Sequence, residues 1–123
     1  MYRGATFLVP SGPSGLHLYV VTTNPCPKNS FLLLSVSSIK DGKYHDPTCL
    51  FSGGEHEFIT KRSFVVYGKP EQRLLSAIQK CLACGLFVRK ADLGSPHFDR
   101  ICDGISLSPH RQRWAVEHFA KYR

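Results

Sequence analysis

Side chains that are able to act on a phosphodiester are concentrated in the first half of the chain. They are His17, His45, Asp46, His56, Lys61, Arg62 and Ser63. Cleavage of RNA by internal attack of the 2′-hydroxyl needs a base for that proton, an acid for the leaving 5′-oxygen and a cation near phosphorus. Histidine, a carboxylate and Lys or Arg suffice for these roles, without a metal or a cofactor. We therefore expect a metal-independent site in which His17, His56, Lys61, Arg62 and Ser63 act on the phosphate.

Each of these residues also has an ordinary structural role open to it. A lone histidine is more often a surface or satisfied core residue, and Lys61 with Arg62 can guard a sheet edge against pairing with another chain. In the stretch "HEFITKRSFVVY", strict strand alternation places Lys61 and Ser63 on one face and Arg62 on the other. A lysine and a hydroxyl on one face are a suitable pair for holding a phosphate.

The balance of charge points to a polyanionic partner. The chain has 16 Lys and Arg against 9 Asp and Glu, a net charge of +7. Nucleic acid is the first candidate, an acidic protein is the second, and solubility alone is the remaining explanation. Within the nucleic-acid interpretation, we expect His45, Arg111, Arg113 and Lys121 to bind the nucleic acid.

Five cysteines, an odd number at irregular spacing, argue against a disulfide framework, so we expect free and mostly buried thiols. Cys81 and Cys84 have the C-x-x-C spacing of a zinc pair. Structural zinc sites usually need two such pairs on loops, whereas these two cysteines lie in a helical pattern. Small buried hydrophobes are the favoured interpretation, with metal binding as the alternative.

The first half of the chain, which carries these residues, has the pattern of four or five short strands. Runs rich in β-branched and aromatic residues cover 5–9, 16–23, 30–39, 48–51 and 58–68. Clusters of Pro, Gly, Ser and Asn separate them, and Asp41-Gly42 is a strong turn signal. This pattern favours a small antiparallel sheet or a partly closed barrel.

The second half predicts helices. Pro70 near the start and Gly85 at the end delimit an amphipathic helix over 69–85, and Ser108 with Pro109 begins another over 108–122. A short helix is expected within 95–104. Residues 86–93 are either an edge strand or a simple connection.

The fold class that follows is α+β, a small bent antiparallel β-sheet forming an SH3-like partial barrel with two main helices. The 123 residues, 42% of them hydrophobic, suit one domain over 1–123, β-rich in 1–68 and mostly helical in 69–123. No apolar run approaches the roughly 20 residues that span a bilayer, and the first residues lack the pattern of a signal peptide. We expect a cytoplasmic protein without a membrane partner.

The order of these segments resembles the small-barrel toxins of the PemK/MazF type, which are bacterial endoribonucleases of toxin–antitoxin modules. The resemblance covers about two-thirds of the chain, from "ATFLVPSGPSG" and "HLYVVTTNP" through "FLLLSVSSI" to "FITKRSFVVY". Arg62-Ser63 is similar to the family's Arg-Ser or Arg-Thr pair in a late strand. The resemblance implies single-stranded RNA as substrate, a homodimer with RNA along its interface, and an acidic antitoxin protein as partner.

The sequence departs from this family at two places. Leu16-His17 stands where relatives have Arg-Pro, and Phe64-Val65 stands where an acidic residue follows the basic pair. An active site would then take its acid–base groups from His17, His56 or Asp46. The alternative function is a non-catalytic module on the same fold that binds nucleic acid or an acidic protein, and a third is a structural protein whose charge is incidental.

Overall fold

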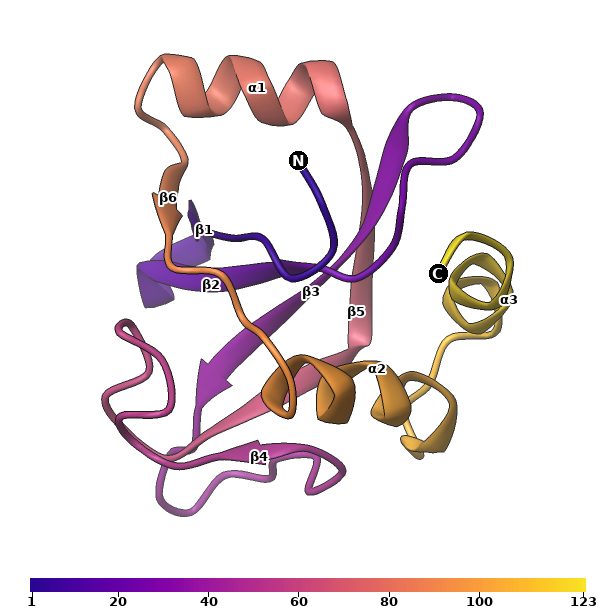
Figure 1. The fold of residues 1–123 in the computed structure, drawn as a ribbon. Helices are drawn as coiled ribbons and strands as arrows, with labels where there is room; N and C mark the ends of the chain where they lie inside the picture. The colour runs from indigo at the N-terminus through magenta and orange to yellow at the C-terminus, as the bar shows by residue number, and fades with distance from the viewer.

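Six strands and three α-helices make up the computed structural model of the chain (Figure 1). It describes the backbone of residues 1–123 and every side chain except that of Ser14. The strands are β1 (Thr6–Pro10), β2 (Leu16–Val21), β3 (Ser30–Ser38), β4 (Leu50–Phe51), β5 (Ser63–Leu74) and β6 (Val88–Lys90). The helices are α1 (Leu75–Ala83), α2 (His97–Leu107) and α3 (Arg113–Tyr122), with a 3-10 turn, η1 (Gly12–Ser14), between β1 and β2.

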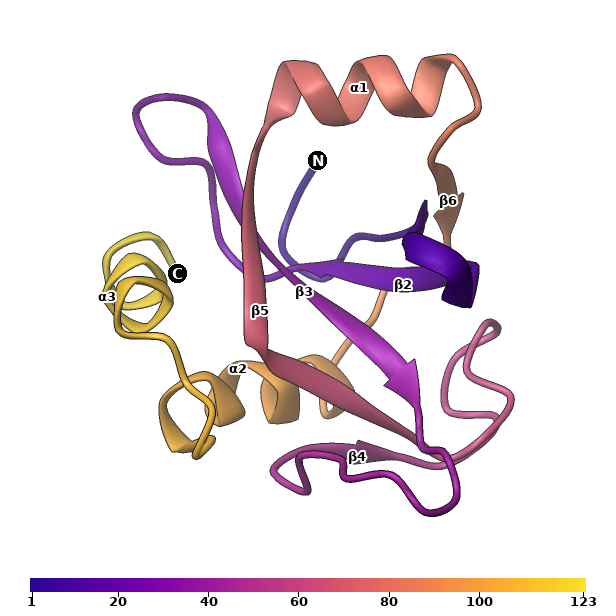
Figure 2. The same cartoon turned by 180° about the vertical axis from the view of Figure 1, so that it is seen from behind.

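The strands form one antiparallel sheet in the order β4-β5-β3-β2-β1-β6. β1 and β2 are a hairpin, in which Thr6 faces Val20 and Pro10 faces Leu16. The long strands β3 and β5 run side by side through the middle of the sheet, and the sheet curls into a half-barrel (Figures 1 and 2). The predicted α+β class with a partial barrel is confirmed.

Alternation along the strands divides the apolar side chains between two cores, one on each face of the sheet. The α2–α3 core lies between the sheet and these two helices and includes Leu18, Leu34, Val65, Tyr67 and Ile101. The α1 core lies on the other face and includes Phe7, Tyr19, Leu33, Ile78 and Phe87. Both cores therefore depend on the same strands, with successive residues of β2 and β3 contributing to opposite sides.

The predicted helix over 69–85 begins later than expected, because β5 continues to Leu74. Pro70 was the signal for a helix start, but it lies inside the strand. The β3–β5 ladder shifts register between Leu33 and Ser35, opposite the stretch between Val66 and Glu71. At such an irregularity a proline is tolerated because no regular ladder bond from its nitrogen is needed.

The predicted strand over 58–68 is also shifted, since β5 starts only at Ser63 and the residues before it form turns and a bend. A single bridge joins His56 to Ile59 in this segment. The alternation argument therefore does not apply to Lys61 and Arg62. Their positions are set by the turn that leads into β5.

The helix predicted over 108–122 starts at Arg113 instead. Ser108 does not cap it, because the Ser108 hydroxyl donates to Asp46 Oδ2 (2.5 Å) and accepts from the backbone N–H of His110 (3.0 Å). These bonds hold a turn at 109–110 between α2 and α3. The short helix expected within 95–104 is the eleven-residue α2, so the fold has a third full helix. The undecided segment 86–93 contains the edge strand β6, paired with β1.

Within the described chain, every helix falls short of the length and apolar character needed to cross a membrane.

Candidate active site

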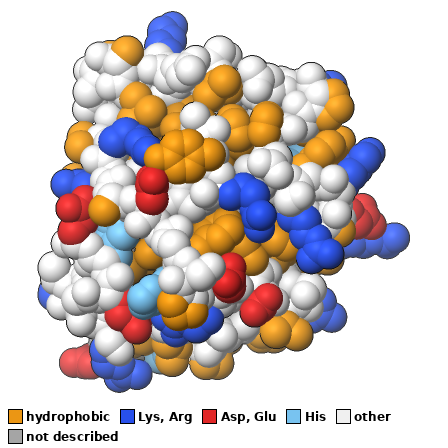
Figure 3. All heavy atoms as spheres, viewed as in Figure 1, with side chains coloured by type: hydrophobic (Ala, Val, Ile, Leu, Met, Phe, Trp, Pro, Cys, Tyr) orange, Lys and Arg blue, Asp and Glu red, His pale blue; other side chains and the backbone are white. Residues whose placement is uncertain are grey.

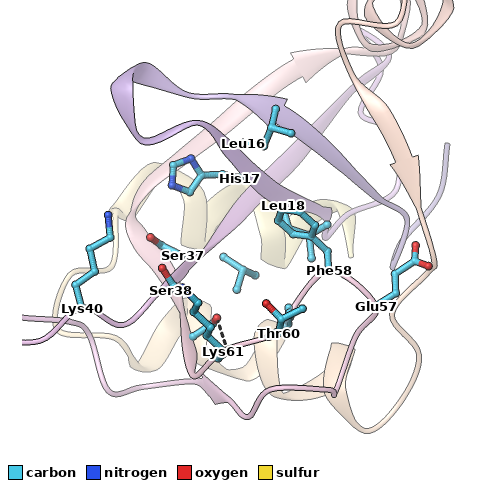
Figure 4. Close-up of a pocket in the computed structure, with 13 residues that line it drawn as sticks. Leu16, His17, Leu18, Ser37, Ser38, Lys40, Glu57, Phe58, Thr60 and Lys61 are labelled. Atoms are coloured by element: carbon cyan, nitrogen blue, oxygen red, sulfur yellow. Dashed lines mark hydrogen bonds between the residues drawn. The ribbon is translucent and has the colours of Figure 1, made fainter.

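A cleft of about 300 Å³ opens where the start of β2, the end of β3 and the turn before β5 meet. Its polar and charged lining consists of His17, Ser37, Ser38, Lys40, Glu57, Thr60, Lys61 and Ser63. In Figure 4, His17, Ser37, Ser38 and Lys40 lie on one side of the cleft and Glu57 lies on the other, with Leu18 and Phe58 between them. Three of the predicted site residues, His17, Lys61 and Ser63, thus share one cleft.

His17 reaches the cleft from β2, where it is paired with Val9 of β1. Its side chain is half-buried, and Nδ1 is shielded from solvent with no hydrogen-bond partner in the described part of the chain. A buried polar atom without a partner costs free energy, so this nitrogen is an unusual feature of the cleft wall. The imidazole is also the side chain best suited to exchange a proton near neutral pH.

Lys40 and Lys61 supply positive charge at the same cleft. Lys40 follows β3 and Lys61 precedes β5, and their neighbours are joined by a bond from the Ile39 N–H to the Arg62 carbonyl (2.9 Å). This bond closes the end of the β3–β5 ladder, so two lysines far apart in the sequence come to the same place. Both ammonium-bearing residues are exposed and able to reach an anion.

Ser63 is the first residue of β5 and is 6% exposed. Its hydroxyl donates to the carbonyl of Lys61 (2.9 Å), which fixes the turn that carries the lysine. In the ladder Ser63 faces Ser38 of β3, so hydroxyl-bearing residues line both strands at this end of the cleft. Ser63 therefore positions Lys61 and the cleft wall.

Glu57 is the acidic residue of the lining, and its carboxylate is already engaged. Oε1 accepts a hydrogen bond from the backbone N–H of Ala91 (2.8 Å), just after β6. Glu57 also stands at the far side of the cleft from Lys40 (Figure 4). The side of the cleft that holds His17 and Lys40 therefore keeps its positive character.

His56, predicted as a catalytic residue, lies outside the cleft lining and is buried. Its Nδ1 accepts from the N–H of Phe58 (3.0 Å), so Nε2 carries the proton and donates to the carbonyl of Ala91 (2.6 Å). Both ring nitrogens are committed to the backbone, and together with Glu57 they tie the segment before β5 to the end of β6. In this structure His56 holds the cleft wall in place.

The other predicted site residues are distributed elsewhere. Arg62 is exposed and stands outside the lining, although it is next to Lys61. The ring of His45 packs 5.6 Å from that of Phe64. Arg111 Nη1 donates to the Ser108 carbonyl (3.0 Å), Arg113 pairs with Glu117 (3.0 Å), and Lys121 lies over the ring of Tyr122. None of these residues is among those that line the cleft as described.

Lys and Arg side chains are spread over several parts of the face in Figure 3. On this face they do not gather into one stripe. The excess of Lys and Arg is therefore not concentrated at one place on this face.

The sequence interpretation missed Lys40, Ser37 and Ser38 as cleft residues. A usable signal was present, because "SVSS" places hydroxyls in a strand next to three leucines, where packing alone would favour apolar residues. What the pattern lacked was the register that brings the end of β3 beside the turn before β5.

All five cysteines are free thiols, as predicted. Cys26 and Cys49 are buried, Cys81 and Cys102 are half-buried and Cys84 is exposed, so the expectation that the thiols are mostly buried is wrong. Cys84 ends α1, with its thiol 3.5 Å from the carbonyl of Cys81. Among the described side chains, no three His, Cys, Asp or Glu residues are grouped as metal ligands.

Comparisons with protein-family models, with curated proteins and with solved structures gave no match. The resemblance to PemK/MazF toxins accordingly stays a prediction from the order of the segments.

Proposed function

We propose that the protein is an endoribonuclease that cleaves single-stranded RNA by internal attack of a 2′-hydroxyl. The observation that carries the proposal is the meeting of His17, with its buried and unpartnered Nδ1 among the described residues, and two lysines in one cleft. The net charge of +7 favours the approach of a polyanion. The order of segments that resembles the PemK/MazF toxins points to the same class of reaction.

In the proposed reaction His17 accepts the proton of the 2′-hydroxyl. The 2′-oxygen then bonds to phosphorus while the bond from phosphorus to the 5′-oxygen breaks. The 5′-oxygen takes a proton from water, which leaves a 2′,3′-cyclic phosphate and a 5′-hydroxyl. Lys40 and Lys61 stabilise the charge that develops on the phosphate oxygens. Ser63 holds the Lys61 backbone in place, and His56 holds the cleft wall.

The test is cleavage of a long single-stranded RNA in EDTA by wild-type protein, read on a gel and by end-group analysis. We expect discrete fragments with cyclic phosphate and 5′-hydroxyl ends, and no cleavage of DNA of the same sequence, since DNA lacks the nucleophile. His17→Asn should slow cleavage at least about 100-fold, because general-base catalysis contributes that much or more. Lys61→Ala should slow it by a comparable factor.

Two control variants distinguish the loss of a cleft side chain from the loss of a histidine or lysine elsewhere on the surface. His110→Asn and Lys80→Ala change an exposed histidine and an exposed lysine outside the cleft lining. Both should cleave as fast as wild type. Cleavage that survives His17→Asn would refute the assignment of the site. Intact RNA with retarded mobility in every lane would instead establish a module that binds nucleic acid without cleaving it.

A further inference from the structure

A second hollow adjoins the cleft. This outer groove, of about 580 Å³, lies on the face of the sheet that carries the α1 core, and it meets the cleft at His17 and Ser37, which line both. Tyr19, Val66 and Pro70 contribute apolar surface to it, and Lys69 and Glu71 contribute charge. A strand of RNA whose phosphate sits in the cleft therefore has room for a neighbouring nucleotide in the outer groove.

The surface of the outer groove suits a flat ring with polar edges. Val66 and Pro70 are half-buried, so they offer apolar area against which a base can lie. The hydroxyls of Ser11 and Ser35 stand in the same lining. Proteins hold unpaired bases between aromatic or apolar side chains, with polar groups at the base edge for selection.

Glu71 is the selective group of the outer groove. Arg73 donates to it from Nη2 (2.7 Å) and Nε (3.1 Å), and both bonds end on Oε1. The second oxygen, Oε2, has no bond to Arg73. Burial, and next a hydrogen bond with the Glu71 carboxylate, raise the pKa of Tyr19, so the tyrosine hydroxyl stands beside this carboxylate at the wall of the groove.

We propose that the outer groove binds one nucleobase of the RNA, and that Glu71 selects a base with an exocyclic amino group. A carboxylate oxygen accepts a hydrogen bond from the amino group of cytosine, adenine or guanine. Uracil has no amino group, and its N3–H lies between two carbonyl oxygens that a carboxylate repels. This inference rests on the proposed function, since the cleft is taken to hold the adjacent phosphate.

The test compares poly(C) with poly(U), which present pyrimidine rings of the same size. Cleavage rates are measured in EDTA, and the affinities of fluorescent oligo(C) and oligo(U) are measured in parallel by anisotropy. We expect wild type to favour the cytosine substrate about tenfold in rate or affinity, the size of one good base contact. Glu71→Gln should bring the ratio close to one, because the amide also donates to uracil.

Two variants control for the lost ion pair. Glu117→Gln removes a carboxylate that also pairs with an arginine, Arg113 (3.0 Å), but on α3 outside the groove lining, so it should keep the wild-type ratio. Arg73→Gln removes the partner of Glu71 and keeps its carboxylate, so it should keep the preference as well. If Arg73→Gln loses the cytosine preference to the same extent as Glu71→Gln, the ion pair between Arg73 and Glu71 matters only for the structure of the groove.

The two proposals fail in different ways. Cleavage of both polymers at equal rates, with equal affinities, would overturn the role of Glu71 and leave the endoribonuclease standing. Cleavage of neither polymer, together with no cleavage of the long single-stranded RNA, would overturn the endoribonuclease, and the anisotropy ratio would then decide the inference alone. A cytosine preference that Glu71→Gln does not reduce would also overturn it.

Discussion

Replacement of Gly104 by alanine tests the packing between α2 and the sheet. A Cβ on Gly104 would overlap the hydroxyl of Tyr67 and lie 2.9 Å from its Cε2. Tyr67, on β5, is 2% exposed, and its hydroxyl donates to the carbonyl of Ile101 (2.7 Å). The ring cannot move aside without losing this buried hydrogen bond, so the added methyl group must strain the interface.

The change in the free energy of unfolding is the balance of one stabilising and two destabilising effects. In an exposed helix, alanine in place of glycine stabilises by about 1 kcal/mol. Overpacking of a core costs about 1–3 kcal/mol, and a buried polar group left without its hydrogen bond costs about 1–3 kcal/mol more. We therefore expect Gly104→Ala to lower the free energy of unfolding by about 3 kcal/mol, which corresponds to a fall of about 12 °C in Tm for a chain of this length.

Urea denaturation at 25 °C and thermal melting followed by circular dichroism measure this change. Ser106→Ala, at an exposed position of the same helix, is the matched control and should leave stability within about 0.5 kcal/mol of wild type. Tyr67→Phe removes the overlapping oxygen, so the double variant with Gly104→Ala should be more stable than the sum of the two single losses. A Gly104→Ala protein more stable than wild type would refute the packing argument.

Three further predictions concern titration and thiol reactivity. Burial by itself would raise the pKa of Asp46, but hydrogen bonds from Ser108 and Thr48 outweigh it and hold the pKa below its usual value. Ionised Asp46 thus stabilises the fold at pH values above its unfolded-state pKa, and this stabilisation is lost as pH falls through the lower folded-state pKa. Asp46→Asn should therefore lower the free energy of unfolding, measured by urea denaturation, by about 2 kcal/mol at pH 7 and by much less at pH 2. Burial, and secondarily Lys121, lower the pKa of His118. The free energy of unfolding should therefore decline as pH falls from the unfolded-state pKa of about 6.5 through the lower folded-state pKa. His118→Leu should make this decline shallower. Burial raises the pKa of Cys102 to about 11, so at pH 7.5 a maleimide should label Cys84 in the native protein and Cys102 only after unfolding, as peptide mass mapping would show.

Local signals predicted most of the fold. The runs that became β1, β2 and β3 are apolar and β-branched, and Asp41-Gly42 lies in the turn after β3, where it was expected. The errors came from residues whose partners are distant in the sequence. Pro70 has the pattern of a helix start, but it lies in β5 at an irregularity of the ladder with β3. Ser108 has the pattern of a helix N-cap, but its hydroxyl donates a hydrogen bond to Asp46 instead.

The candidate site was predicted in residue type more than in arrangement. His17, Lys61 and Ser63 belong to one cleft because the β2–β3 and β3–β5 pairings bring their backbones together. Lys40 was missed because it is brought to the cleft by the hydrogen bond between Ile39 and Arg62, which are distant in the sequence. The role of His56 could not be read from neighbours in the sequence, since its ring bonds to Ala91, 35 residues away.

The division of the apolar side chains between two faces governs how the sequence can vary. Volume changes at Phe7 or Ile78 in the α1 core are separated by the sheet backbone from changes at Val65 or Ile101 in the α2–α3 core. Free energies of substitutions in sites without shared neighbours add. Substitutions at such distant positions of the two cores should therefore have additive effects, whereas a change at His17, which lines both the cleft and the outer groove, alters both hollows at once.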